Sequence, residues 1–285
     1  MEIKVQRHTD LDSLLKAAAS IEGRIFYLAG GTDLMVQAHA GVLPPATWLE
    51  ISDVPQLHGI SVEGSELRIG AGVTHHEIMR SQLVQTWAPA LAQASANVGG
   101  PQIRSRGTIG GNLANASPVA DTVPALYSLG AQLHLISQRG ERTVAVEEFA
   151  LAPRRNVLEP GEIIYSINFP CRPGIKGVWN SMAQRESLAI SKVNIGVSYV
   201  LDPDLEEGVG FNYLQVAFGA VGPTVLRARQ VEEYLRAEPL SAQRLERACQ
   251  LAQSEVSPIS DVRSQADYRR AMAGVLLYDA LSPLL

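Results

Sequence analysis

The sequence has little cysteine and no long apolar run. Cys171 and Cys249 are the only cysteines among its 285 residues. An iron–sulfur cluster ordinarily draws on more thiolates than these, and a structural zinc site needs clustered cysteine and histidine. A membrane-spanning helix needs about 18 consecutive apolar residues, which no window of the chain provides. The sequence therefore predicts a protein that holds no metal cluster by itself and does not span a membrane.

Charge of one sign is not concentrated in any segment. The formal net charge is -5, and the 24 basic residues form no long run, which argues against nucleic acid as the main partner. Asp10, Asp12 and Lys16 interrupt the N-terminal stretch, so it lacks the apolar core of a signal peptide. We expect a cytoplasmic protein, in whose reducing compartment the two distant cysteines stay unpaired.

The sequence does contain enough apolar residues for more than one core. Hydrophobic residues make up 46% and charged residues 19%, which excludes a mainly disordered or fibrous chain. Because 285 residues exceed the usual size of one hydrophobic core, we expect two or three modules, with a one-domain barrel as the alternative.

The first two modules mix helices with strands. Residues 1–56 predict a small α/β unit: a helix beginning near Thr9, a strand at 25–29, a turn at Gly30-Gly31, a helix closing near Gly41 and a strand at 47–51. Residues 57–172 predict a hairpin and then helices at 74–81, 89–97 and 121–129 and strands at 131–137, 141–146 and 162–169.

A third module follows the turn-forming run Cys171-Arg172-Pro173-Gly174. In residues 173–285 the apolar spacing predicts three strands covered by three helices. The strands are expected at 178–185, 193–201 and 212–220, and the helices at 228–236, 241–255 and 265–281. The fold class is therefore α+β.

Two glycine-rich segments are the strongest functional signal. Gly30-Gly31 directly follows a buried strand and precedes a helix, where backbone N–H groups can approach an anion, although a tight turn without ligand is the commoner use of such a pair. The second segment runs from Gly99 to Ser117, too long for a simple connection. Together they suggest a diphosphate held between two modules, yet neither fits the two common glycine-rich nucleotide-binding motifs.

Two motifs in these segments carry a family resemblance. Ala29-Gly30-Gly31-Thr32-Asp33-Leu34 and Arg106-Gly107-Thr108-Ile109-Gly110-Gly111-Asn112-Leu113 resemble the FAD-binding medium subunit of molybdenum hydroxylases, a family that includes xanthine dehydrogenases, aldehyde oxidoreductases and carbon monoxide dehydrogenases. The resemblance extends to the stretches 67–74 and 100–104 and to Tyr268-Arg269-Arg270.

The resemblance implies a two-lobed FAD-binding domain of the vanillyl-alcohol-oxidase type, with lobes at 1–56 and 57–172, and a C-terminal α/β domain at 173–285 with a small antiparallel sheet and three helices. It places the diphosphate in both glycine segments. The residues that it implies in cofactor binding are Leu28, Ala29, Gly30, Gly31, Thr32, Asp33, Leu34, Val98, Thr108, Gly110, Gly111, Asn112, Ser117, Asp121 and Ile164.

Some of these implied roles have open alternatives. Asp121 is expected to meet a polar part of the flavin or ribityl chain. Val98 and Ile164 match apolar positions against the cofactor, but plain core packing explains them equally well. Relatives often carry lysine near Asn180, so a charged contact is expected to be missing there. The segment 184–193 either gates the electron acceptor or is a simple strand connection.

By the same resemblance, the chain is an FAD-binding electron-transfer subunit that takes electrons from iron–sulfur clusters on a partner and passes them to an external acceptor. The implied partners are an iron–sulfur small subunit and a large subunit with the molybdenum cofactor. The alternatives are a self-sufficient FAD-dependent oxidoreductase with its own substrate pocket and a nonredox nucleotide-binding regulator. No motif for nucleophilic catalysis is visible, so no catalytic residue is predicted on this chain.

One further cluster, His75-His76-Glu77, invites a metal interpretation. Neighbouring histidines on a helix point about 100° apart, and no further ligand has suitable spacing. Helix capping with a solvated face is therefore the favoured interpretation.

Overall fold

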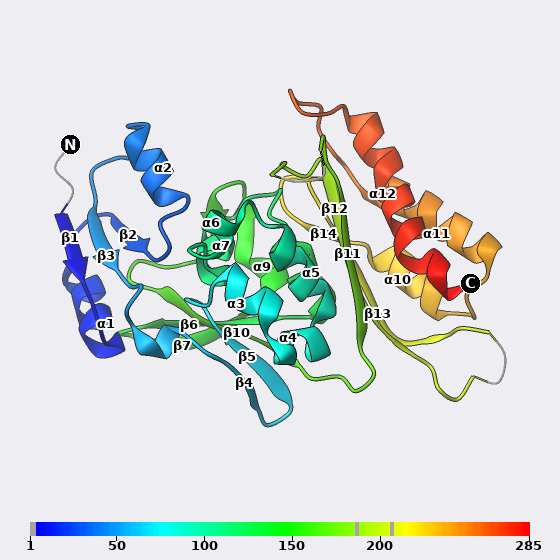
Figure 1. Ribbon diagram of the computed structural model, residues 1–285. Coiled ribbons are helices and arrows are strands. Elements are labelled where there is room, and N and C mark those ends of the chain that lie inside the picture. The colour runs from blue at the N-terminus through cyan, green and yellow to red at the C-terminus, as the bar shows by residue number, and fades with distance from the viewer. Residues whose placement is uncertain (1–3, 186–187, 206–207) are drawn as a thin grey trace.

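The chain folds around three main β-sheets, which follow one another along the sequence. The computed structural model describes residues 4–185, 188–205 and 208–285. Figure 1 shows the sheets in sequence order, with the N-terminal lobe at one end, a second lobe in the middle and a C-terminal domain whose helices face away from both. The predicted α+β class and the predicted sequence of two lobes followed by a helix-covered sheet are confirmed.

The first lobe is a three-stranded parallel sheet with one helix packed against it. The strand order is β1-β3-β2, so the first strand lies at an edge. Asp10 accepts a hydrogen bond from the Ser13 N–H at 2.8 Å and starts the helix, whose Leu14 and Ala18 are buried. The elements are β1 (Lys4–Arg7), α1 (Leu11–Ser20), β2 (Ile25–Leu28), α2 (Leu34–His39) and β3 (Thr47–Glu50).

The second lobe is built on a five-stranded antiparallel sheet of order β4-β5-β10-β6-β7. Its strands are β4 (Ile60–Glu63), β5 (Glu66–Gly70), β6 (Gln132–Ser137), β7 (Gly140–Ala145) and β10 (Ile163–Pro170). A short 3₁₀ helix, η1 (Pro55–Leu57), precedes β4. A short pair, β8 (Ala150–Ala152) and β9 (Arg155–Asn156), stands apart from it.

Helices cover one face of that sheet and bury the largest core (Figure 1). The predicted capping box is confirmed, because Thr74 Oγ1 accepts from Glu77 N at 3.2 Å and the Glu77 carboxylate accepts from Thr74 N at 2.7 Å. The helices of this lobe are α3 (His75–Arg80), α4 (Gln82–Trp87), α5 (Pro89–Asn97), α6 (Pro101–Arg104), α7 (Ile109–Ala114), α8 (Thr122–Leu129) and α9 (Val146–Phe149).

The C-terminal domain is a sheet with helices on both sides. Helices α5 and α8 of the second lobe pack on one face, and the domain's own three helices pack on the other (Figure 1). A fourth strand was not predicted, because Leu226 and Arg227 are too short a run to show a strand pattern. The elements are β11 (Lys176–Met182), β12 (Val193–Leu201), β13 (Phe211–Gly219), β14 (Leu226–Arg227), α10 (Arg229–Arg236), α11 (Ala242–Glu255), α12 (Ala266–Leu281) and η2 (Ser282–Leu284).

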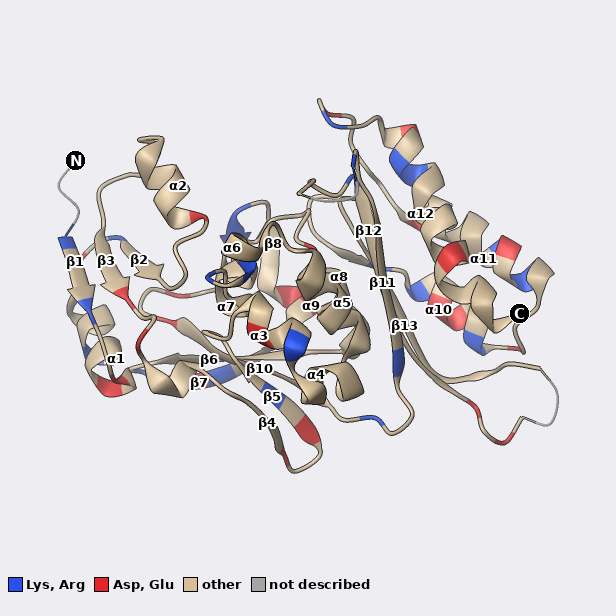
Figure 2. Cartoon of the chain, viewed as in Figure 1, with Lys and Arg blue, Asp and Glu red and all other residues tan. Residues whose placement is uncertain are grey.

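Surface charge and metal ligands give no second functional signal. Basic and acidic segments are interspersed along the chain in Figure 2. Among the described residues, no three histidine, cysteine or acidic side chains gather where they could hold a metal ion. No described helix is both long enough and apolar enough to cross a bilayer. The segment 184–193 keeps its two predicted roles open, since Glu186 and Ser187 lie outside the described residues.

A buried ionic network fixes the C-terminal domain to the second lobe. The Arg227 guanidinium donates to Glu232 at 2.8 Å and to Glu147 of α9 at 2.8 Å. Glu232 is only 2% exposed, and its carboxylate also accepts from the Val216 N–H at 2.9 Å. Arg229 also contacts Glu147, but its side chain is 66% exposed. Of the two arginines, Arg227 is therefore the one whose loss would leave a buried carboxylate without its cationic partner.

Replacing Arg227 should destabilise the protein strongly. Arg227→Met leaves Glu232 charged and buried with its main partner removed, which typically costs about 3–5 kcal/mol. Arg229→Met removes a solvent-exposed ion pair to the same Glu147 and should cost about 1 kcal/mol or less. Urea unfolding of both variants checks the difference, and equal costs would show that the network does not secure the domain.

Candidate functional site

The two glycine segments meet directly. Strand β2 ends at Leu28, and Gly30 then lies against the backbone of the second segment. A Cβ placed on Gly30 would stand 1.6 Å from the Arg106 carbonyl oxygen and 2.4 Å from its carbon. A Cβ on Gly107 would stand 3.3 Å from Thr32 Oγ1. No side chain fits at Gly30, so glycine there allows the two lobes to touch.

Backbone hydrogen bonds to residues 71–75 hold the second glycine segment in place. Gly110 N donates to the Ala71 carbonyl at 2.9 Å, Ile109 N to Val73 at 3.0 Å and His75 N to Gly107 at 3.0 Å. A Cβ on Gly110 would lie 2.6 Å from the Ala71 Cβ. Gly110 is therefore required for packing against the end of β5.

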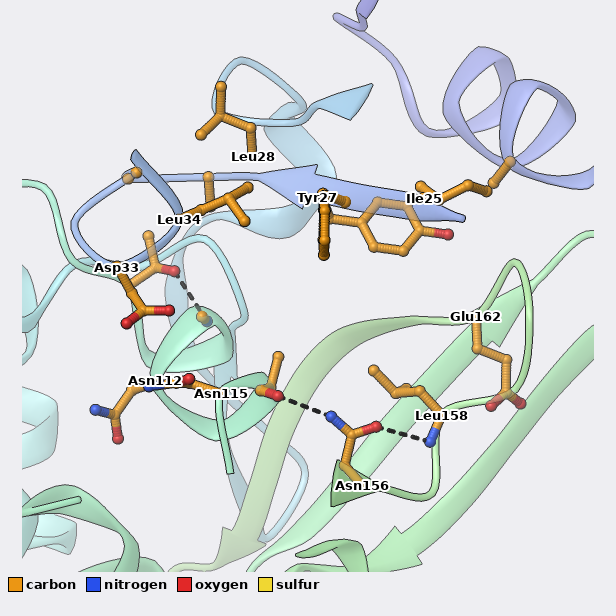
Figure 3. Close-up of a pocket in the computed structure, with 18 of the residues that line it drawn as sticks. Ile25, Tyr27, Leu28, Asp33, Leu34, Asn112, Asn115, Asn156, Leu158 and Glu162 are labelled. Carbon is orange, nitrogen blue, oxygen red and sulfur yellow. Dashed lines mark hydrogen bonds between the residues drawn. The ribbon is translucent and has the colours of Figure 1, made fainter. Parts of the chain in front are cut away.

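A cavity of about 890 Å³ opens at this meeting point. Its size lies within the range of roughly 300–1,000 Å³ that is usual for ligand pockets. In Figure 3, Ile25 and Tyr27 of β2 lie opposite Leu158 and Glu162, and Asn112 of α7 and Asn115, which follows that helix, form another part of the wall. The cavity thus extends from the glycine segments to an end along β2 that has both apolar and charged lining residues.

Polar groups of α7 face the cavity with hydrogen-bonding capacity to spare. Thr108 starts the helix by accepting from Gly111 N at 3.1 Å. Asn112 Oδ1 accepts from Thr122 Oγ1 at 2.8 Å, whereas its amide nitrogen donates to no described group. On the other wall, Asn156 donates to the Ala114 carbonyl at 2.8 Å and accepts from Leu158 N at 3.1 Å, which fixes Leu158 (Figure 3). The Asn112 amide is therefore a donor available to a ligand.

Most of the residues proposed from the sequence line this cavity, and four do not. Ile164 is 6% exposed and belongs to the core beneath the five-stranded sheet. Ser117 caps a turn, accepting from Val119 N at 3.4 Å. Gly110 and Asp121 are likewise absent from the lining. The residues that do line it are Leu28, Ala29, Gly30, Gly31, Thr32, Asp33, Leu34, Val98, Thr108, Gly111 and Asn112.

Asp121 joins two domains instead. Its Oδ1 accepts from Ser191 Oγ at 2.7 Å and from Asn194 Nδ2 at 3.0 Å, and its carbonyl accepts from Trp179 Nε1 at 2.8 Å. All three donors belong to the C-terminal domain. Burial raises the pKa of the Asp121 carboxyl, and the two side-chain hydrogen bonds oppose that rise. A contact from Asp121 to the cofactor stays a prediction, as does the missing charge at Asn180, whose Oδ1 accepts from the Ser181 N–H.

Several lining residues carried no sequence signal. Tyr27 and Ile25 read as ordinary strand residues, and Leu158 lies in an irregular stretch after β9. Burial, with a smaller contribution from Glu162, raises the pKa of Tyr27 to about 12. Only the fold brings these residues together, because Tyr27 and Glu162 stand on different lobes.

His75 was assigned to a solvated helix face, and that expectation is wrong. It occupies the first position of α3, is 2% exposed and lines the cavity, whereas His76 is exposed. Burial, and next the nearby Arg104, lower the pKa of His75 to about 4. The imidazole is therefore neutral near pH 7. The error arose because α3 packs under the second glycine segment, a contact that helix periodicity does not reveal.

Comparison with known proteins covers the whole chain. The pattern of the FAD-binding domain in molybdopterin dehydrogenase matches residues 1–172, and that of the CO dehydrogenase flavoprotein C-terminal domain matches residues 181–284. The xanthine dehydrogenase FAD-binding subunit of Escherichia coli O157:H7 is similar, at 31% identity over 85% of this chain and 82% of its own length.

Relatives named for carbon monoxide dehydrogenase are comparably similar. The medium chain from Hydrogenophaga pseudoflava is 30% identical over 90% of this chain and 87% of its own length. A structure of carbon monoxide dehydrogenase from that organism superposes with a TM-score of 0.92 at 27% identity, covering 100% of this chain and 97% of the other. These similarities confirm the predicted fold class and FAD as the predicted cofactor.

Gly30 should not tolerate even a methyl group. Gly30→Ala forces its Cβ into the Arg106 carbonyl, so the lobes must separate, at a cost of about 3 kcal/mol in unfolding free energy. Gly222→Ala is the matched control, because its Cβ would meet an ordinary contact at 3.4 Å and should cost about 1 kcal/mol or less. Urea unfolding measures both, and equal stability of the two variants would refute the tight approach.

The buried imidazole of His75 predicts a pH dependence of the ligand-free protein. In the unfolded chain His75 has its ordinary pKa of 6.5 and becomes protonated below that pH. In the folded protein its pKa is about 4, so the ring stays neutral until the pH falls that far. The free energy of unfolding should therefore fall by roughly 3 kcal/mol as the pH drops across that window. His75→Phe should flatten this part of the profile, and His76→Phe should not. Urea unfolding at several pH values tests it, and parallel profiles for wild type and His75→Phe would contradict it.

Proposed function

Because the chain belongs to the family of FAD-binding domains of molybdopterin dehydrogenases, we propose that it is the electron-transfer subunit of a heteromeric molybdenum hydroxylase. It takes electrons from iron–sulfur clusters on a partner chain and passes them to an external acceptor. The observation that carries the proposal is the meeting of the two glycine segments at the cavity wall.

The residues around the cavity fit FAD. A diphosphate needs hydrogen-bond donors that approach without side chains in the way, and Gly30 and Gly31 lie on the lining. Gly31 has a φ of 74°, which turns the chain sharply before α2. The Asn112 amide adds a side-chain donor, and the end of the cavity along Ile25 and Leu158 offers space for one of the two ring systems.

The chain's own residues hold and shield the cofactor. FAD, when bound, accepts two electrons and can release them singly or together. Thr108 and Asn112 would fix the diphosphate, Ile25 and Leu158 would exclude water from the ring at their end, and β2 would hold the first lobe against it. The protein thereby sets the position of the cofactor and the access to it.

The electrons must come from another chain on this account. Among the described residues no side-chain cluster could hold a metal ion, so iron–sulfur and molybdenum centres would belong to partners. We propose an iron–sulfur small subunit and a molybdenum-binding large subunit as those partners, in the cytoplasm. Relatives named for xanthine, carbon monoxide and nicotinate dehydrogenases are 31%, 30% and 32% identical to this chain. Because these subunits are similar although the enzymes are named for different substrates, we place the substrate pocket on a different polypeptide.

Purification tests the proposal at two levels. The protein should carry a flavin absorption spectrum, and an iron–sulfur chain and a molybdenum chain should co-purify with it in its native host. Protein that neither retains nor rebinds flavin would refute the redox function. A lone flavoprotein that turns over a small substrate would instead favour a self-sufficient oxidoreductase.

Loss of the α7 donor should weaken FAD binding. Asn112→Ala removes an amide that faces the cavity, so the dissociation constant of FAD should rise about 5- to 100-fold. Gly111→Val, which brings a branched side chain to within 3.0 Å of Thr108 Oγ1, should lower flavin occupancy further. Asn168→Ala on β10, outside the cavity, is the control. Flavin fluorescence titration measures all three, and full occupancy in both α7 variants would contradict the assignment.

A further inference from the structure

The imidazole of His75 is a buried polar group without a partner. Its Nδ1 is inaccessible and makes no hydrogen bond within the described chain. No described side chain or backbone group bonds the other ring nitrogen. Because Nδ1 is closed to solvent and ligand alike, the ring nitrogen that can bond a ligand in the cavity is Nε2. A proton on Nε2 leaves only a lone pair buried at Nδ1 and directs the one N–H donor of the neutral ring to the cavity.

The ring stands at the junction of the two glycine segments. Its Cδ2 lies 3.4 Å from the point where a Gly107 Cβ would be, and Thr32 Oγ1 lies 3.3 Å from the same point. The backbone N–H of His75 donates to the Gly107 carbonyl at 3.0 Å, and this hydrogen bond holds the residue, and with it the ring, beside the second glycine segment. Both segments and His75 line one cavity.

The surroundings of the ring favour an anion. Arg104 is close enough to disfavour the charged form of His75, so a positive charge is already present beside the ring. The Arg104 guanidinium is itself fixed by the Gly99 carbonyl at 2.7 Å. A neutral imidazole can still donate one N–H, and an acceptor-only group such as a phosphate oxygen takes such a donor.

We propose that His75 donates a hydrogen bond from its neutral ring to the diphosphate of the dinucleotide and so positions that diphosphate between the two lobes. This rests on the proposed function, which supplies the FAD. His75 would be a positioning residue, distinct from the two glycine motifs and contributed by the start of α3.

The test compares three variants of the full-length protein after its flavin has been removed. His75→Phe keeps a planar ring but has no N–H, His75→Gln keeps an N–H donor, and His76→Phe alters the exposed neighbour. The dissociation constant of FAD is measured for each by flavin fluorescence, with unfolding in urea as a check on folding. The ³¹P spectrum of bound FAD reports on the diphosphate itself.

The expected result separates hydrogen bonding from packing. His75→Phe should raise the dissociation constant about tenfold, His75→Gln should restore most of that loss, and His76→Phe should match wild type. The ³¹P resonances of bound FAD should move in His75→Phe and stay in place in His76→Phe.

Two outcomes would overturn the proposal. Wild-type FAD affinity in His75→Phe would show that the ring donates nothing to the ligand. Equal weakening in His75→Phe and His75→Gln, with unmoved ³¹P resonances, would show that only packing is lost. Wild-type protein that binds no FAD would instead refute the proposed function on which this inference rests.

Discussion

The approach of Gly30 to the Arg106 carbonyl is the constraint on which the rest of the site depends. It brings the N-terminal lobe against the second lobe at a distance that no side chain permits. The cavity and the facing of β2 toward Leu158 follow from that contact. A site for a long ligand thus arises between lobes, which neither lobe could form alone.

The C-terminal domain is secured beside this site by apolar packing and by polar contacts. The core of the second lobe includes Ile175, Ala217 and Val225 of the C-terminal domain, and the sheet of β11 to β14 has helices of the second lobe on one face and its own helices on the other. Asp121 ties α8 to the C-terminal domain through Ser191 and Asn194, and Arg227 ties α9 to α10 through two carboxylates. Such contacts fix orientation, because each buried charge is satisfied only in one arrangement.

The sequence predicted the fold class and FAD, and most of the residues that it proposed around the cofactor line the cavity. Glycine pairs that follow a strand or lie in a long loop can be recognised from the local sequence alone. It missed β1, where Lys4 and Arg7 obscure the strand pattern, and β14, which is too short to show one. It also missed Tyr27, Leu158 and the buried state of His75. The place of these side chains depends on contacts between residues distant in sequence. Such contacts also place Ile164 in the core of the second lobe.

The central claim is that both glycine segments grip one diphosphate. A crystal structure of the protein with bound FAD tests it most directly. The account predicts diphosphate oxygens within hydrogen-bonding distance, about 3 Å, of backbone N–H groups in the segment around Gly30 and Gly31 and of the Asn112 side-chain amide in the second segment. A diphosphate held by one segment only, or placed outside the cavity between the lobes, would contradict it.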